Sequence, residues 1–249
     1  MGRYTVFYKS ILAMGVVFVL FAFTANFTSV SKVGVEKKIV KKETVVDENT
    51  VVDDKIEKAY KELFANNYEL PSHECFVEGV KGFYSLKDKG IFKQDVITLI
   101  DFSLASSLKR LWIVDLSNNK VLFQTYVAHG INTGDVFATN FSNAPESFKS
   151  SLGFYATGES YKGTHGLSLR LDGLEKDVND NARNRAVVLH GAKYVSESYI
   201  KNYGRIGRSL GCPAVPVECV ASIISMIKGK SCLFIYHPST VKQDDKLVS

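Results

Sequence analysis

Short apolar runs separated by turn residues dominate the chain after residue 91, and this pattern limits its fold more than any other feature. The runs lie at residues 96–102, 111–116, 121–127, 186–189 and 232–236. Between the second and third runs, Ser-Asn-Asn-Lys at 117–120 has the composition of a hairpin turn. Apolar runs of this length suit strands with a buried face. The sequence therefore predicts a mainly β domain over residues 91–238, with a few helices.

Residues 53–90, before this domain, have a helical pattern instead. Apolar side chains recur at helical spacing after Asp53, which suits the N-cap position, and two asparagines at 66–67 end the pattern. A second helix is expected over residues 75–86, because a Pro-Ser pair precedes it and a Lys-Gly pair follows it. We therefore expect a short helical segment in front of the β domain.

A further helix is expected late in the β domain. Pro216 suits a first helical turn, an apolar face follows within residues 220–227, and Lys228-Gly229 marks the end. The positive end of its dipole would then point back at the preceding segment.

The N-terminus has the pattern of an export signal. Arg3 and Lys9 precede an apolar stretch at 11–23, which small residues follow. Residues 1–25 are therefore expected to be a signal peptide, or a membrane anchor if they are retained. Residues 26–52 have the composition of a charged linker, and residues 239–249 that of a tail. We expect the protein to be exported.

Charge excludes one class of partner. The chain has 31 basic and 26 acidic residues and a formal net charge of +5. No block of lysine and arginine is interleaved with aromatic residues, so no nucleic-acid partner is expected.

The chemistry-bearing feature is Cys212, which lies between a glycine and a proline and 22 positions after His190. A thiol attacks as thiolate and needs a base, a role that suits the strand-end His190. Pro213 has no N–H group, so amides that stabilise an oxyanion must come from Gly211, Cys212 or Leu210.

Two further groups follow from this hypothesis. The carbonyl of Gly191 is expected to accept from one ring nitrogen of His190 and so leave the other free for Cys212. Arg205 and Arg208 would add positive potential near the thiol.

A series of motifs in fixed order points to a family. They are Ala-His-Gly at 128–130, Phe-Ser-Asn at 141–143, Ser-Ser-Leu-Gly-Phe-Tyr at 150–155, Tyr-Lys-Gly-Thr-His-Gly at 161–166, Asn-Asp-Asn-Ala-Arg at 179–183, His-Gly at 190–191 and Gly-Arg-Ile-Gly-Arg-Ser-Leu-Gly-Cys at 204–212. Over residues 95–237 the chain resembles the murein L,D-transpeptidases with a YkuD-type catalytic domain.

This resemblance implies a β-sandwich catalytic domain and a cysteine acyltransferase of the bacterial envelope or periplasm. Cys212 would be the nucleophile, His190 the base and Gly191 the orienting carbonyl, with the Gly211 and Cys212 amides at the oxyanion. The substrate would be a peptidoglycan tetrapeptide stem, cleaved before its terminal D-alanine and joined to an amine. Further candidates for substrate contact are Ser209, Arg208, Arg205, Tyr194, His165 and Tyr155.

The sequence departs from the family pattern at two positions. Leu210 and Ala214 stand where the widespread motif has histidine and asparagine. Two alternatives therefore stay open: an L,D-carboxypeptidase that trims the same stems, and a catalytically silent peptidoglycan-binding module.

No metal or other cofactor is expected. His165 and Asp172 have a spacing used by zinc D,D-peptidases, but Gly163 and Ser168 do not match the rest of that pattern. No acidic residue lies at the usual short spacing before His190. The remaining cysteines, Cys75, Cys219 and Cys232, allow at most one disulfide, whose pairing the sequence does not assign.

Overall fold

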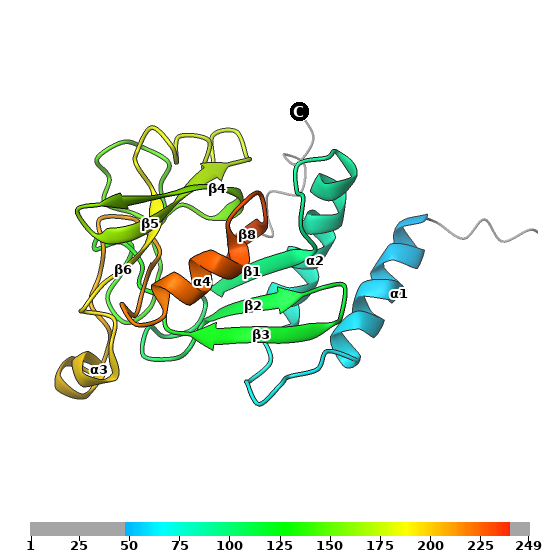
Figure 1. Cartoon of the computed structure of the whole chain (residues 1–249), viewed down its shortest axis with the longest axis horizontal. Helices are drawn as coiled ribbons and strands as arrows, with labels where there is room; N and C mark the ends of the chain where they lie inside the picture. Colours follow the sequence, from blue (N-terminus) through cyan, green and yellow to red (C-terminus); the bar gives the residue numbers. More distant parts are fainter. Residues whose placement is uncertain (1–47, 240–249) are drawn as a thin grey trace, which may run out of the picture. The chain divides into compact units, whose positions relative to one another are not determined.

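Eight strands form one mixed sheet in the order β3-β2-β1-β8-β4-β5-β6-β7 (Figure 1). The structure, a computed structural model, describes residues 48–239. The strands are β1 (Val96–Asp101), β2 (Leu111–Asp115), β3 (Lys120–Thr125), β4 (Gly153–Gly163), β5 (Gly166–Gly173), β6 (Val188–Gly191), β7 (Ala214–Val215) and β8 (Cys232–Tyr236). The expected β fold behind a helical segment is confirmed. The strands of the expected sandwich are hydrogen-bonded into one continuous sheet.

Four helices accompany the sheet within the described residues. They are α1 (Glu48–Lys61), α2 (His73–Asp88), α3 (Glu197–Tyr203) and α4 (Val220–Ile227). α2 begins after Ser72, whose hydroxyl accepts from the Cys75 amide at 3.4 Å as an N-cap. α1 begins at Glu48, five residues before the expected start of the helical segment at Asp53. The reason is that Val52 already packs on the apolar cluster beneath the helix.

The helical segment packs on one face of the sheet. Ile56 of α1 and Phe76 of α2 share a buried cluster with Trp112 of β2. Gly82 permits this close packing, because a Cβ atom there would lie 2.0 Å from the ring of Phe154. The two helices are therefore part of the domain's core and not a detached spacer.

A second buried cluster lies against α4 and joins the strands that carry the site. Ile223 and Ile227 of α4 pack with Leu189 of β6 and Val215 of β7. Because these side chains are 0% exposed, β6 and β7 are held rigidly.

The expected start of α4 at Pro216 is wrong. Residues 217–219 form a turn, in which the Cys219 amide donates to the Pro216 carbonyl at 3.0 Å, and the helix begins only at Val220. The expected strand at 186–189 also lies two residues later in the structure, because Ala186 has a positive φ of 53° that ends the preceding turn.

The predicted export signal and most of the charged linker, residues 1–47, lie outside the described residues, as does the tail from 240. Between residues 48 and 239, none of the helices has the length and apolar content to cross a bilayer.

Candidate active site

His190 is the last residue but one of β6. Its side chain is 3% exposed, and Nδ1 lies 3.1 Å from the carbonyl oxygen of Gly191. A carbonyl only accepts, so Nδ1 carries the proton and Nε2 is the unprotonated nitrogen of the neutral ring. The contact expected between His190 and Gly191 is therefore present.

Cys212 lies beside the same strand. In the parallel pairing of β6 with β7, His190 is opposite Ala214. Cys212 lies two residues before Ala214, and Val188 lies two residues before His190. Sγ of Cys212 is 3.5 Å from the amide nitrogen of Val188 and 3.7 Å from the carbonyl oxygen of Ala186. Residues two apart on a strand share a face, so Val188 and His190 project to the same side. Cys212 itself is half-buried.

The local environment keeps both groups neutral. Burial raises the pKa of the Cys212 thiol, and the Val188 amide and the positive charge of Arg185 oppose this rise only in part. Burial also lowers the pKa of His190, against its bond to Gly191, and the charge of His165 lowers it further. Both shifts disfavour a thiolate–imidazolium pair. A neutral imidazole can act as a general base toward a neutral thiol that comes within hydrogen-bond distance of it.

A strained turn presents the thiol. Gly211 has φ +124°, and a Cβ atom there would lie 2.9 Å from the carbonyl oxygen of Lys149. Ser209 closes the turn, since its hydroxyl donates to the Cys212 carbonyl at 2.6 Å and accepts from the Gly211 amide at 3.1 Å. The Gly211 amide, an expected oxyanion donor, is therefore occupied by Ser209 in this state.

Arg185 is a site residue that the sequence reasoning missed. Its guanidinium donates to the carbonyl oxygens of Ser142 (2.8 Å) and Lys149 (2.6 Å) and to the hydroxyl of Ser151 (2.6 Å). This side chain fixes the loop under Gly211 and places a positive charge near Cys212. Its position just after the Asn-Asp-Asn-Ala-Arg motif was the available signal.

His165, a candidate for substrate contact, lies against the base. Its ring stacks on that of His190, with centroids 4.4 Å apart and planes at 25°. His165 itself is exposed.

Arg205 and Arg208 do not direct their charges at the thiol as expected. Both pair with Asp135, at 2.7 Å and 3.2 Å, and Arg208 also donates to the carbonyl oxygen of Gly134. The exposed carboxylate of Asp135 is therefore the partner of both arginines.

The two tyrosines expected at the substrate differ in position. Tyr155 is 0% exposed, and its hydroxyl donates to the Ser151 carbonyl at 3.0 Å, so it is a core residue and not a groove residue. Tyr194 is half-buried, and both burial and the nearby Cys212 raise its pKa to about 12. Only Tyr194 of this pair lies near the nucleophile.

The two departures from the family motif have different surroundings. Leu210 is 67% exposed, whereas Ala214 is buried and pairs with His190 in the sheet. An asparagine at 214 would need space that the packed β6–β7 pair does not offer.

All four cysteines lie within the described part of the chain and are free thiols, with Cys75 and Cys232 fully buried. In the same part, no three His, Cys, Asp or Glu side chains are grouped in a way that could hold a metal ion. His129 has a structural role, because its Nδ1 accepts from the buried guanidinium of Arg110 at 2.8 Å.

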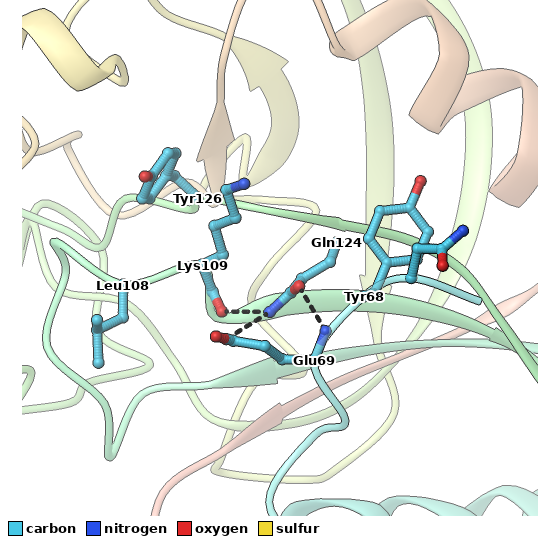
Figure 2. Close-up of a pocket in the computed structure, with 7 residues that line it drawn as sticks. Tyr68, Glu69, Leu108, Lys109, Gln124 and Tyr126 are labelled. Atoms are coloured by element: carbon cyan, nitrogen blue, oxygen red, sulfur yellow. Dashed lines mark hydrogen bonds between the residues drawn. The ribbon is translucent and has the colours of Figure 1, made fainter. Parts of the chain in front are cut away.

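Two adjoining cavities of about 550 and 310 Å³ lie beside the end of β3. Figure 2 shows the larger one, in which Gln124 lies between Glu69 and Lys109 and is hydrogen-bonded to both. Neither cavity is lined by Cys212 or His190, so their residues are not part of the candidate site.

A family model described as the L,D-transpeptidase catalytic domain matches residues 67–236, which include α2 and the whole sheet. A comparison with curated proteins finds no match.

Solved structures of low similarity include three of interest. An L,D-transpeptidase from Mycobacterium smegmatis is 11% identical, with a TM-score of 0.37, over 58% of this chain and 59% of that one. The helical cell shape determining protein Pgp2 (K307A mutant) from Campylobacter jejuni is 14% identical, with a TM-score of 0.39, over 63% and 53%. An L,D-transpeptidase from Xylanimonas cellulosilytica is 11% identical, with a TM-score of 0.33, over 75% and 93%. The chain thus spans just over half the length of the first two.

The family model covers well over half of the sequence and includes both His190 and Cys212. The chain therefore belongs to the L,D-transpeptidase catalytic domain family.

Proposed function

We propose that the protein is a peptidoglycan L,D-transpeptidase that uses Cys212 as nucleophile and His190 as general base. The observation that carries this proposal is the neutral, tautomer-fixed imidazole on the same strand that borders the thiol. The substrate is the tetrapeptide stem, and the bond broken is the one before its terminal D-alanine. Membrane attachment through residues 1–25 and an envelope location belong to the same proposal.

The acylation step starts from the neutral pair. Sγ of Cys212 attacks the carbonyl carbon while Nε2 of His190 takes the thiol proton. The tetrahedral intermediate collapses with loss of D-alanine, whose nitrogen receives that proton from His190, and a thioester remains on Cys212. An amine of a neighbouring stem then attacks the thioester and gives its proton to His190. The Cys212 sulfur leaves and regains that proton.

The oxyanion needs donors that the turn supplies. We assign the Cys212 amide to the oxyanion, and the Gly211 amide could join it by exchanging its bond with the Ser209 hydroxyl for one with the oxyanion. Ser209, Tyr194 and His165 border the nucleophile or the base, and they are the side chains that we assign to the substrate's surroundings.

One observation favours a second candidate, the catalytically silent peptidoglycan-binding module. Burial raises the pKa of the Cys212 thiol, whereas an activated nucleophile commonly has a lowered pKa. A catalytic Cys212 with a raised pKa requires that His190 removes the thiol proton during attack. Turnover that depends on Cys212 would therefore favour the enzyme over the silent module.

The test is incubation of the full-length protein with purified tetrapeptide muropeptides and analysis of the products by mass spectrometry. The matched control is Cys219→Ala, another half-buried thiol outside the site. We expect cross-linked dimers that Cys212→Ala abolishes and Cys219→Ala does not. Tripeptides without dimers would assign the L,D-carboxypeptidase, and products independent of Cys212 would contradict the proposal.

A further inference from the structure

A two-residue turn at the tip of the β4–β5 hairpin brings a second imidazole to the base. The hairpin closes with Gly163 opposite Gly166, so Thr164 and His165 form the tip. The ring of His165 then lies on the ring of His190, at a centroid separation of 4.4 Å and an interplanar angle of 25°. Among the described residues, no other aromatic ring packs on the ring of His190.

The hairpin is anchored well enough to hold this ring in place. Arg183 binds Asp172 of β5 and donates to Glu159 of β4 at 3.0 Å, and Glu159 also pairs with Arg170 at 3.0 Å. β5 in turn pairs with β6, where Ser168 is opposite His190. β5 begins directly after the hairpin tip that contains His165, and its residue Ser168 is opposite His190. The pairing of β5 with β6 therefore brings His165 to the base.

The stack explains the burial of the base. His190 is only 3% exposed, and the exposed ring of His165 covers one of its faces. The hydrogen bond to Gly191 fixes which nitrogen carries the proton, but a single bond leaves the ring free to tilt about it. Contact on the face of the ring removes that freedom.

We infer that His165 is a positioning residue for His190: it holds the ring in the plane that the Gly191 bond defines and keeps it uncharged for proton transfer. The catalytic role of this positioning rests on the proposed function. The stacking of the two rings does not depend on the proposed function.

Electrostatics supports this role. The charge of His165 lowers the pKa of His190, because a second positive charge on the stacked ring is unfavourable. The groups that face His190 are His165 from the hairpin tip, the Gly191 carbonyl and the uncharged Ser168 of β5. Arg185 and Tyr194 face Cys212 instead. Burial is the largest cause of the lowered pKa of His190, and His165 adds to the lowering through its charge.

Two substitutions separate the stack from the charge. His165→Phe keeps a planar ring but loses the charge, and His165→Ala loses both. Thr164→Ala, in the same turn and exposed, is the matched control. The full-length protein with ¹⁵N-labelled histidine is titrated by NMR, and the His190 signal is identified by its loss in His190→Gln.

We expect the pKa of His190 to rise in both His165 variants and to stay unchanged in Thr164→Ala. The tautomer with Nδ1 protonated should persist in His165→Phe and become mixed in His165→Ala. With muropeptide substrate, kcat should fall on the order of tenfold in His165→Ala with KM nearly unchanged, a fraction of what a positioned base contributes. In His165→Phe the acid limb of the rate profile should move to higher pH.

An unchanged titration and tautomer of His190 in both variants would overturn the inference. So would a rise in KM alone, which would assign His165 to substrate binding. Because the NMR titration needs no turnover, it decides the role of His165 even if the wild-type protein proves inactive and the proposed function fails.

Discussion

Nδ1 of His190 donates a hydrogen bond to the carbonyl oxygen of Gly191, the next residue in the chain. The base and the group that orients it are therefore neighbours in sequence, and both lie in β6. A carboxylate in the place of the Gly191 carbonyl would stabilise the protonated, positively charged imidazole. A neutral carbonyl stabilises the charged imidazole less. This relationship fits a neutral base better than a resting ion pair.

The reactivity of Cys212 should reflect that neutral state. Because burial raises the thiol pKa, alkylation of Cys212 by iodoacetamide at pH 7 should be slower than that of a cysteine in an unfolded peptide, and should accelerate as the pH rises. Peptide mapping after quenched labelling at a series of pH values measures this. Rapid alkylation at pH 6 would instead indicate a thiolate and contradict the neutral pair.

Arg185 should affect both stability and the thiol. Arg185→Ala removes four charge-assisted bonds to the 142–151 loop, and we expect the free energy of unfolding to fall by about 2 kcal/mol. It should also slow the alkylation of Cys212 at pH 7, because a positive charge near the thiol is lost.

Arg185→Lys separates these two effects. Lysine keeps the charge but not the planar fork that reaches several acceptors. Denaturant unfolding should therefore show most of the stability loss, while alkylation of Cys212 stays close to the wild-type rate. Equal alkylation rates in the wild-type protein and Arg185→Ala would show that the charge does not act on the thiol.

The turn at Gly211 should not accept a side chain. Gly211→Ala combines a positive φ with a Cβ atom 2.9 Å from the Lys149 carbonyl oxygen. Gly204→Ala is the matched control, because Gly204 also has a positive φ, of 71°, but open space around it. The control should cost about 1 kcal/mol of unfolding free energy. Gly211→Ala should cost clearly more and abolish turnover; equal costs would mean that the turn adapts.

His129 should contribute a pH dependence to stability. Burial, together with the charge of Arg110, lowers its pKa to about 4 in the folded protein, against an ordinary value near 6.5. Between these values the unfolded chain binds a proton that the folded protein does not, so stability falls as the pH falls from about 6.5 to about 4. The loss attributable to His129 is about 3 kcal/mol.

His129→Asn tests this prediction, because an asparagine oxygen can accept from Arg110 but does not titrate. Urea unfolding of the wild-type protein and of the variant at pH 7 and pH 4.5 should show a smaller loss in the variant. Parallel losses in the two proteins would assign the acid sensitivity to other groups.

The sequence predicted the elements that depend on local pattern. α2, the β2–β3 hairpin and β8 follow from apolar periodicity and turn residues, and the structure confirms them. The pairing of His190 with Gly191 was also predictable, because a carbonyl one residue away needs no knowledge of the fold.

The remaining features depend on contacts between distant segments. His165 reaches His190 only because β4 and β5 form a long hairpin beside β6, and no local pattern encodes that position. Tyr155 was a candidate for substrate contact, but it lies in the first half of β4, where every residue is buried. Arg205 and Arg208 are close to Cys212 in sequence, but Asp135 binds both.

The most direct test of the account is the intact mass of the full-length protein mixed with a tetrapeptide stem whose own free amines are acetylated, so that no amine acceptor is present. We predict a mass increase equal to the stem without its terminal D-alanine. Peptide mapping should place it on Cys212, and Cys212→Ser should not form the same thioester. An unmodified Cys212 under conditions in which D-alanine is released, or the adduct on another residue, would contradict the central claim that Cys212 is the acylated nucleophile.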